Sequence, residues 1–243
     1  MDRVIWQVTG TDALPFLQGL VSNDVLPLKA PGIVYAAILS PQGKYLADFF
    51  VVNTGDALLI DIAESLAATT HRRLTMYKLR ADVQITPVDM PVARGIGPAP
   101  AGAFTDPRTP AMGWRAYGTA QTETVDWDAL RVAHLVPETG RELIPDDSYL
   151  LEMGFERLHG VDFRKGCYVG QEVTARMKHK TELRKGLARV RLHGVASEGD
   201  EITADGKPIG RLHTIAGDAA LAYLRFDRAD GVMMAGTATI TRT

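Results

Sequence analysis

The hydrophobic residues of the first ninety positions follow two periods, one typical of strands and one typical of helices. After an apolar strand at 4–8, Thr11 or Asp12 is a favourable helix N-cap, and leucines follow at helical spacing towards Val21. Four more strands and one longer helix are predicted, in chain order at 33–39, 45–52, 57–62, 63–76 (the helix) and 79–88. This order of elements predicts a ferredoxin-like α+β lobe over residues 1–90.

The pattern loses this regularity in the next part of the chain. Prolines and glycines are frequent between 87 and 110, which predicts a connection with short edge strands. Helices are predicted from Trp127 to Leu135 and from Gln171 to Lys180, where good helix formers run without a breaker. We therefore expect a middle lobe over 91–185 that ends in the second of these helices.

A third pattern begins after Gly186. Ala188, Val190 and Leu192 alternate with basic residues and a histidine, which is the period of two expected for a strand. Turn sequences rich in glycine and aspartate then recur to the end of the chain. Many short strands between such turns predict a small β-barrel over 186–243, so the whole chain belongs to the α+β class.

The composition is that of an ordinary globular protein, with 46% hydrophobic and 23% charged residues in 243. No apolar run approaches the roughly 20 residues that span a bilayer, and we expect no membrane partner. A single cysteine allows no internal disulfide, which is typical of a reducing compartment, and the expected location is the cytoplasm. It also means that one chain cannot build an all-cysteine metal site.

That cysteine, Cys167, lies in the sequence KGCYVGQE at residues 165–172. Lys165 and the start of the predicted helix lie close to it, and both favour the thiolate form. An accessible thiol of this kind could attack, exchange electrons or ligate a metal. The alternative is a small buried apolar residue, the common fate of a free cysteine. His159 and His179 are too distant in sequence to indicate a zinc site, and nothing around them is typical of a cysteine hydrolase.

The motif KGCYVGQEVTAR at 165–176 resembles the signature of the YgfZ family of folate-binding proteins. It is most similar to the short form that is related to a mitochondrial iron–sulfur cluster assembly factor. That family is in turn similar to the aminomethyltransferase, or T-protein, of the glycine cleavage system. The resemblance implies three lobes around a central cavity, with the middle lobe shortened, and tetrahydrofolate as the cofactor. It also implies an accessory function in iron–sulfur cluster assembly or repair, transient contact with assembly or client proteins, and an indirect link to tRNA modification.

The resemblance also implies roles for particular residues. Cys167 and Asp48 are the expected catalytic residues, and no metal ligands are expected. The residues expected to bind the folate are Asn23, Asp24, Tyr35, Lys165, Gly166, Tyr168, Gly170, Gln171, Glu172 and Arg176. Other interpretations stay open for three of them, because Asn23 and Asp24 also suit a helix end followed by a turn, and Tyr35 suits a core position.

Two positions depart from the T-protein pattern. Ala47 stands where the resemblance implies the first of two acidic residues, and Ala133 where it implies a glutamate that grips the pterin. These losses argue against the alternative function, a tetrahydrofolate-dependent aminomethyltransferase, because that reaction needs controlled protonation near the pterin.

Charge is distributed unevenly along the chain. Between 164 and 191 nine lysines and arginines face two glutamates, a charge of +7, and the rest of the chain carries −9. Such a strip attracts anions, for which a folate polyglutamate tail, RNA and plain solvent exposure are the alternatives. Direct nucleic-acid binding is the weaker one, because no aromatic residues alternate with the basic ones.

Overall fold

The computed structural model describes residues 2–121, 123–179 and 182–243. The N-terminal lobe is built on a five-stranded antiparallel sheet with the order β2-β3-β4-β1-β5. Its elements are β1 (Arg3–Thr9), α1 (Ala13–Gln18), a 3-10 turn (Leu26–Lys29), β2 (Gly32–Leu39), β3 (Tyr45–Asn53), β4 (Leu58–Ala63), α2 (Glu64–Lys78) and β5 (Gln84–Val88). The order β3-β4-β1-β5 is the ferredoxin-like one, and β2 adds an edge strand.

Both faces of this sheet are buried, because alternate residues of the central strands point to opposite sides. On β3, Phe49 and Val51 pack into the cluster that α1 and α2 cover. Phe50 and Val52 pack into a second cluster on the other face. The uninterrupted apolar run over 45–52 is what a strand buried on both faces requires.

Two predicted elements are shorter than expected. The first helix ends at Gln18, because Val21 pairs with Ile38 as an isolated β-bridge and so leaves the helix. The last strand of the lobe begins at Gln84 instead of position 79. Leu79 has φ +45° and is exposed, so it ends α2 in a turn and does not start a strand.

The middle region has little regular structure. It contains β6 (Val92–Gly95), β7 (Phe104–Thr105), a 3-10 turn (Pro110–Met112), β8 (Trp114–Tyr117), α3 (Trp127–His134) and α4 (Gln171–His179). The strands form a small sheet with the order β6-β8-β7. Both predicted helices are present, and the end predicted for the second, Lys180, lies outside the described residues.

The predicted C-terminal barrel is confirmed. Its strands are β9 (Lys185–His193), β10 (Glu201–Ala204), β11 (Lys207–Ala216), β12 (Ala219–Arg225), β13 (Met233–Ala235) and β14 (Ala238–Arg242), with a 3-10 turn (Phe226–Arg228) before β13. They close in the order β10-β11-β12-β9-β14-β13 around their own apolar core. The α+β class is therefore confirmed as well.

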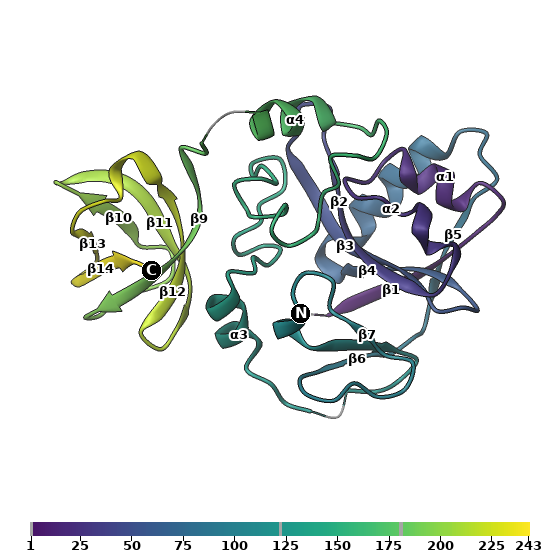
Figure 1. Ribbon diagram of the computed structural model, residues 1–243, viewed down its shortest axis with the longest axis horizontal. Coiled ribbons are helices and arrows are strands. Elements are labelled where there is room, and N and C mark those ends of the chain that lie inside the picture. The colour runs from purple at the N-terminus through teal and green to yellow at the C-terminus, as the bar shows by residue number, and fades with distance from the viewer. Residues whose placement is uncertain (1, 122, 180–181) are drawn as a thin grey trace.

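Figure 1 shows the barrel at one end, the large sheet at the other, and α3 and the irregular segment before α4 between them. The main apolar cluster crosses these boundaries, since it joins Phe50 of the sheet, Phe155 of the irregular segment and Leu221 of the barrel. The division at 90 and 185 into separate lobes stays a prediction. None of the described helices is long and apolar enough to cross a bilayer.

Candidate functional site

The cysteine motif forms an exposed loop that leads into α4. Cys167 is solvent-exposed. The neighbouring Gly166 has no other atom within 4 Å of the place where a Cβ would stand, so the surface around the thiol is open. The alternative of a cysteine buried in the core is therefore wrong, and the sulfur is accessible to another molecule.

Lys165 anchors this loop to the N-terminal lobe. Its Nζ donates hydrogen bonds to the main-chain oxygens of Gln18, at 2.8 Å, Asn23, at 2.9 Å, and Val21. An ammonium group has three N–H donors, and these carbonyls at the end of α1 take all of them. Burial lowers the pKa of Lys165 to about 8. The residue predicted to bind a carboxylate tail has no free donor in this arrangement, and the contacts make it a structural clamp.

Gly170 lets the start of α4 pack directly on the β2–β3 turn. It has φ +82°, and a Cβ there would stand 2.3 Å from the Ser40 carbonyl oxygen. Gly43 faces it with φ +76°, where a Cβ would stand 2.7 Å from the Val173 Cβ. Only glycine meets both requirements at these positions. The motif glycine therefore has a packing role.

We expect Gly170→Ala to destabilise the protein by about 1–3 kcal/mol, because it adds backbone strain to a contact that has no free space. Gly166→Ala is the matched control, since the added methyl group meets no other atom within 4 Å. Urea unfolding of both variants measures the difference. Equal stability of Gly170→Ala and the wild type would show that the turn and α4 do not pack as described.

The other motif residues divide between the interior and the surface. Tyr168 is buried, and burial raises its pKa to about 12. Its main-chain N–H donates to Gln171 Oε1 at 3.2 Å, so Gln171 braces the loop from the first turn of α4. Glu172 and Arg176 are exposed on α4. Their predicted binding roles stay predictions, whereas the contacts of Tyr168 and Gln171 are internal to the motif.

Asn23 and Asp24 hold the turn after α1. Asn23 Nδ2 donates to the main-chain oxygens of Tyr35, at 2.8 Å, and His159, at 2.6 Å. Asp24 Oδ1 accepts from Gln18 Nε2 at 3.0 Å. Asn23 also lines an open hollow of about 400 Å³ beside the motif loop, with Glu156, His159, Val161, Asp162, Phe163 and Arg164. The turn interpretation accounts for the contacts of both side chains.

Asp48 belongs to a different part of the molecule. It lies on β3, where Oδ1 accepts from Tyr45 Oη and Thr139 Oγ1, both at 2.6 Å, and Oδ2 accepts from Tyr35 Oη at 2.9 Å. Tyr35 is fully buried and its ring stacks on Phe155 with centroids 5.1 Å apart. The two predicted catalytic residues are therefore not brought together, since Cys167 is on the surface and Asp48 is in the core.

Arginines line the cavity at Asp48, and the sequence reasoning named none of them. This central cavity measures about 70 Å³. Its lining comprises Arg3, Asp48, Phe50, Val92, Arg94, Arg108, Met112, Arg115, Gln121, Arg131, Pro137, Glu138 and Thr139. A drug-sized ligand needs about 300–1,000 Å³. At this volume the cavity does not accommodate a tetrahydrofolate, so we derive no step through one, and folate binding stays a prediction.

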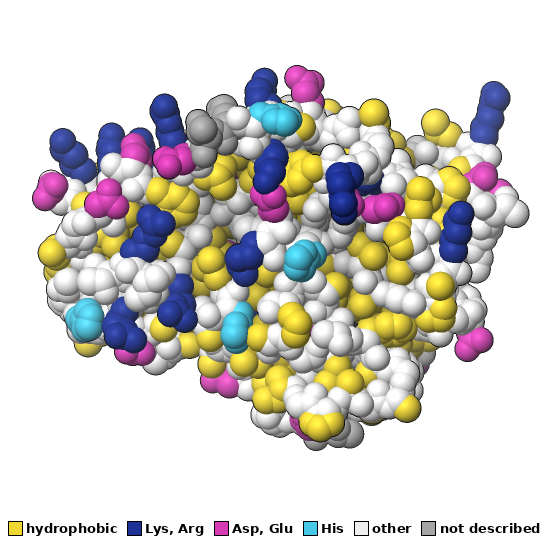
Figure 2. Space-filling view, viewed as in Figure 1, with side chains coloured by type: hydrophobic (Ala, Val, Ile, Leu, Met, Phe, Trp, Pro, Cys, Tyr) yellow, Lys and Arg dark blue, Asp and Glu magenta, His cyan; other side chains and the backbone are white. Residues whose placement is uncertain are grey.

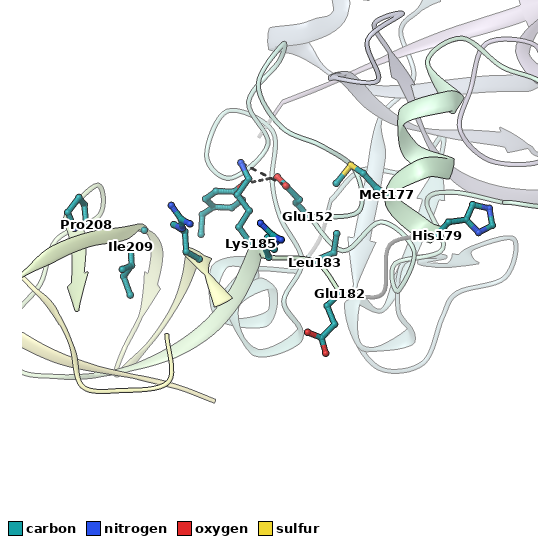
Figure 3. A pocket seen from close by; sticks show the side chains of 12 residues that line it. Glu152, Met177, His179, Glu182, Leu183, Lys185, Pro208 and Ile209 are labelled. Atoms are coloured by element: carbon teal, nitrogen blue, oxygen red, sulfur yellow. Dashed lines mark hydrogen bonds and ion pairs between the residues drawn. The ribbon is translucent and has the colours of Figure 1, made fainter. Parts of the chain in front are cut away.

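Cavities large enough for such a ligand lie beside the barrel instead. One of about 1,110 Å³ separates the end of α4 from the barrel wall, and one of about 700 Å³ lies next to it. Figure 3 shows the larger one, where Glu152 accepts a hydrogen bond from Tyr223 at 2.6 Å and Lys185 approaches the same carboxylate. No residue predicted to bind folate lines either of them.

Basic side chains are frequent on the surface near α4 and the barrel. Figure 2 shows lysine and arginine side chains recurring along the upper edge, over the barrel and α4, with acidic side chains among them. Exposed members of this strip on α4 are Arg176 and Lys178, and Lys178 pairs with Glu156. The predicted positive face is therefore partly neutralised by neighbouring acids.

Comparison with known proteins identifies relatives of this chain. Residues 184–243 match the model of the CAF17 C-terminal beta-barrel domain. The human protein named mitochondrial iron–sulfur cluster assembly factor IBA57 is 30% identical over 94% of this chain and 77% of its own length. The chain belongs to the IBA57 family. A homologue from Mycosarcoma maydis is 33% identical over 76% of this chain and 54% of its own length.

The fold extends beyond the IBA57 family. The crystal structure of the glycine cleavage system aminomethyltransferase T from Bartonella henselae superposes with a TM-score of 0.77, covering 99% of this chain and 82% of that one. Sequence identity is only 12%, so this likeness concerns the fold alone. The relation to the T-protein that the motif implied is confirmed at that level.

The IBA57 relatives correct one expectation. The human, mouse and Mycosarcoma proteins are all named as mitochondrial. The cytoplasmic location predicted from the single cysteine is therefore wrong, because a reduced thiol is equally compatible with other reducing compartments.

The site of this IBA57-family chain offers one accessible thiol and no metal cage of its own. Within 2–121, 123–179 and 182–243, no group of three or more histidine, cysteine or acidic side chains could hold a metal ion. Chemically, the arrangement can present a sulfur ligand to an iron held elsewhere.

Proposed function

We propose that this chain is an accessory factor in the assembly or repair of iron–sulfur clusters, and that the sulfur of Cys167 is the ligand that it offers to the iron. The observation that carries the proposal is the exposure of the only cysteine on a loop that is braced from both sides. Lys165 ties the loop to α1, and Gly170 ties it to the β2–β3 turn. A sulfur held in this way can meet a docking partner without a large ordering cost.

One thiolate cannot hold a cluster by itself, because such clusters are held by about four cysteine ligands. The chain therefore acts with a partner that supplies the other ligands, and the cluster is cargo that passes between the two. Contact is transient, since a permanent mixed site would trap the cluster. Exposed basic side chains on α4 favour an acidic partner surface, and their contribution is to the rate of encounter.

The alternative function, a tetrahydrofolate-dependent aminomethyltransferase, receives no support from the geometry. Both oxygens of Asp48 accept hydrogen bonds from buried hydroxyl groups, so the carboxylate is not free to exchange protons with a substrate. Folate binding stays a prediction from the resemblance that the central cavity does not support. A role in tRNA modification would be indirect, through modifying enzymes that contain clusters.

Deletion of the gene tests the proposal. Several cluster-dependent enzymes should lose activity together, most strongly under oxidative stress, while cluster-free enzymes from the same cells keep theirs. Unchanged cluster enzymes under that stress would count against the proposal, whatever the protein binds in vitro.

A further inference from the structure

Two arginines face each other across the small sheet of the middle region. Arg94 on β6 and Arg115 on β8 are register partners of an antiparallel pair. Side chains at such positions start about 4.5–5.5 Å apart, and like charges directly opposite destabilise a sheet. Both arginines also line the same central cavity. A negative charge between the two guanidinium groups would relieve their repulsion.

The carboxylates nearby satisfy only part of this need. Arg115 Nη1 donates to Asp61 Oδ2 at 3.0 Å. Its Nε is buried and lacks a hydrogen-bond partner among the described residues, and the nearest carboxylate oxygen recorded for it, Asp106 Oδ2, is 3.5 Å away. Arg94 has no carboxylate within 4 Å in the described part of the chain, and its guanidinium lies 4.1 Å from the centroid of the Trp127 ring. Two guanidinium groups thus retain unused donors at one cavity.

The remaining arginines of the cavity are paired with carboxylates, so they are not the groups that lack a counter-charge. Arg3 is bound to Asp61 at 2.5 Å, and Arg108 to Asp106 at 2.7 Å. Arg131 is bound to Glu142 at 2.9 Å. The two acids that line the cavity are also engaged: Asp48 accepts from three hydroxyl groups, and Glu138 Oε2 lies 3.6 Å from Arg131 Nε.

We propose that the central cavity binds a small oxyanion, of the size of bicarbonate, acetate or phosphate, between Arg94 and Arg115. The guanidinium fork matches two oxygens of such an ion, which an ammonium group does not. A volume of about 70 Å³ suits an ion of this size and excludes a folate. This site is separate from Cys167 and goes beyond cluster assembly, since no residue of the motif lines it.

The electrostatics of Arg94 are consistent with this site. Burial lowers the pKa of Arg94 to about 10, and the positive charges of Arg115 and Arg108 contribute to the lowering. A bound anion would favour the charged form of Arg94 and so offset the lowering of its pKa by burial and by the neighbouring arginines. It would also connect the small sheet to the large one, because Arg115 is already bonded to Asp61 of β4.

Thermal unfolding in phosphate, bicarbonate or acetate, each against chloride at equal ionic strength, tests the proposal on the full chain. At ten times its Kd, the preferred oxyanion should raise the Tm of the wild type by about 3–6 °C, with a saturable dose dependence. The ion with the lowest Kd identifies the chemical class of the ligand. Arg94→Gln should weaken that binding by roughly tenfold or more, because it removes the free fork.

Arg242→Gln is the matched control. Arg242 also stacks on an aromatic ring, 4.6 Å from the centroid of Phe226, but it lies on the barrel away from the cavity. It should keep the wild-type affinity. An equal response to chloride and to every oxyanion overturns the proposal, and so does unchanged affinity in Arg94→Gln. Should that variant fail to fold, the wild-type comparison of oxyanions with chloride decides by itself.

Discussion

We expect Cys167→Ser to lower the activity of this protein in cluster maturation strongly while its fold stays intact. Serine preserves the size and polarity of an exposed side chain, so the Tm should change by no more than about 1–2 °C. Its hydroxyl group is a poor ligand for iron compared with a thiolate, and cluster transfer should fall by roughly tenfold or more. Complementation of the deletion strain, followed by assays of several cluster enzymes, measures the cellular effect.

Arg164→Ala is the control in the same loop. The Arg164 side chain is 94% exposed, and its substitution leaves the thiol and both anchors of the loop in place. This variant should restore the cluster enzymes to near the wild-type level. Full complementation by Cys167→Ser would remove the thiol from the mechanism. Equal failure of both variants would instead assign the defect to the loop surface.

The elements of this fold were predictable where one local pattern decides them. The strands β2, β3 and β4 follow from apolar runs and the turn sequences between them, and the barrel follows from alternation between glycine-rich turns. The errors lie where a distant contact decides. The first helix stops early because Val21 pairs with Ile38, a residue whose position depends on the assembled sheet. No local pattern contains that information.

The candidate site shows the same division. Cys167 was identifiable because its surroundings are unusual within eight residues. The role of Lys165 was not, since its three acceptors lie more than 140 positions away in the sequence. From sequence alone, a lysine beside a cysteine is interpreted as a partner of the thiolate. Only the folded structure shows that Lys165 instead clamps the loop to the end of α1.

The arginines of the central cavity were missed for a related reason. Arg3, Arg94 and Arg131 come from three distant segments, and each alone reads as an ordinary surface cation. The register that places Arg94 opposite Arg115 becomes visible only when β6 and β8 are paired. Asp61, the partner of Arg3 and Arg115, was equally hidden, because it occurs within an apolar run that predicts a strand.

Asp61→Asn should be the most destabilising single substitution of those considered, at about 3–5 kcal/mol. The carboxylate is fully buried and accepts from Arg3 Nε at 2.5 Å, Arg115 Nη1 at 3.0 Å and Tyr117 Oη at 3.0 Å. Asparagine retains the shape but removes the charge, which takes the main counter-charge from the buried Arg115 and the partly buried Arg3. Such a loss is a large part of the 5–15 kcal/mol that stabilises a typical domain. Urea unfolding at neutral pH measures it.

Asp227→Asn is the control, because Asp227 forms an exposed pair with Arg225 at 3.3 Å and its loss should change little.

The pH dependence of the unfolding free energy gives a second test of Asp61. Burial by itself would raise the pKa of Asp61, but Arg3 and Arg115 outweigh it and hold that pKa below the usual value. The stabilisation by this carboxylate is therefore complete above the unfolded-state pKa of about 4 and disappears as the pH falls through the lower folded-state value. Unfolding free energies between pH 7 and pH 3 should fall less steeply at the acid end for Asp61→Asn than for the wild type, because the variant lacks this titrating carboxylate. They should still fall, because Asp106, whose pKa is also lowered, titrates in both proteins. Parallel curves for the two proteins would show that folding does not lower the pKa of Asp61, and the two arginines would then not stabilise its charge.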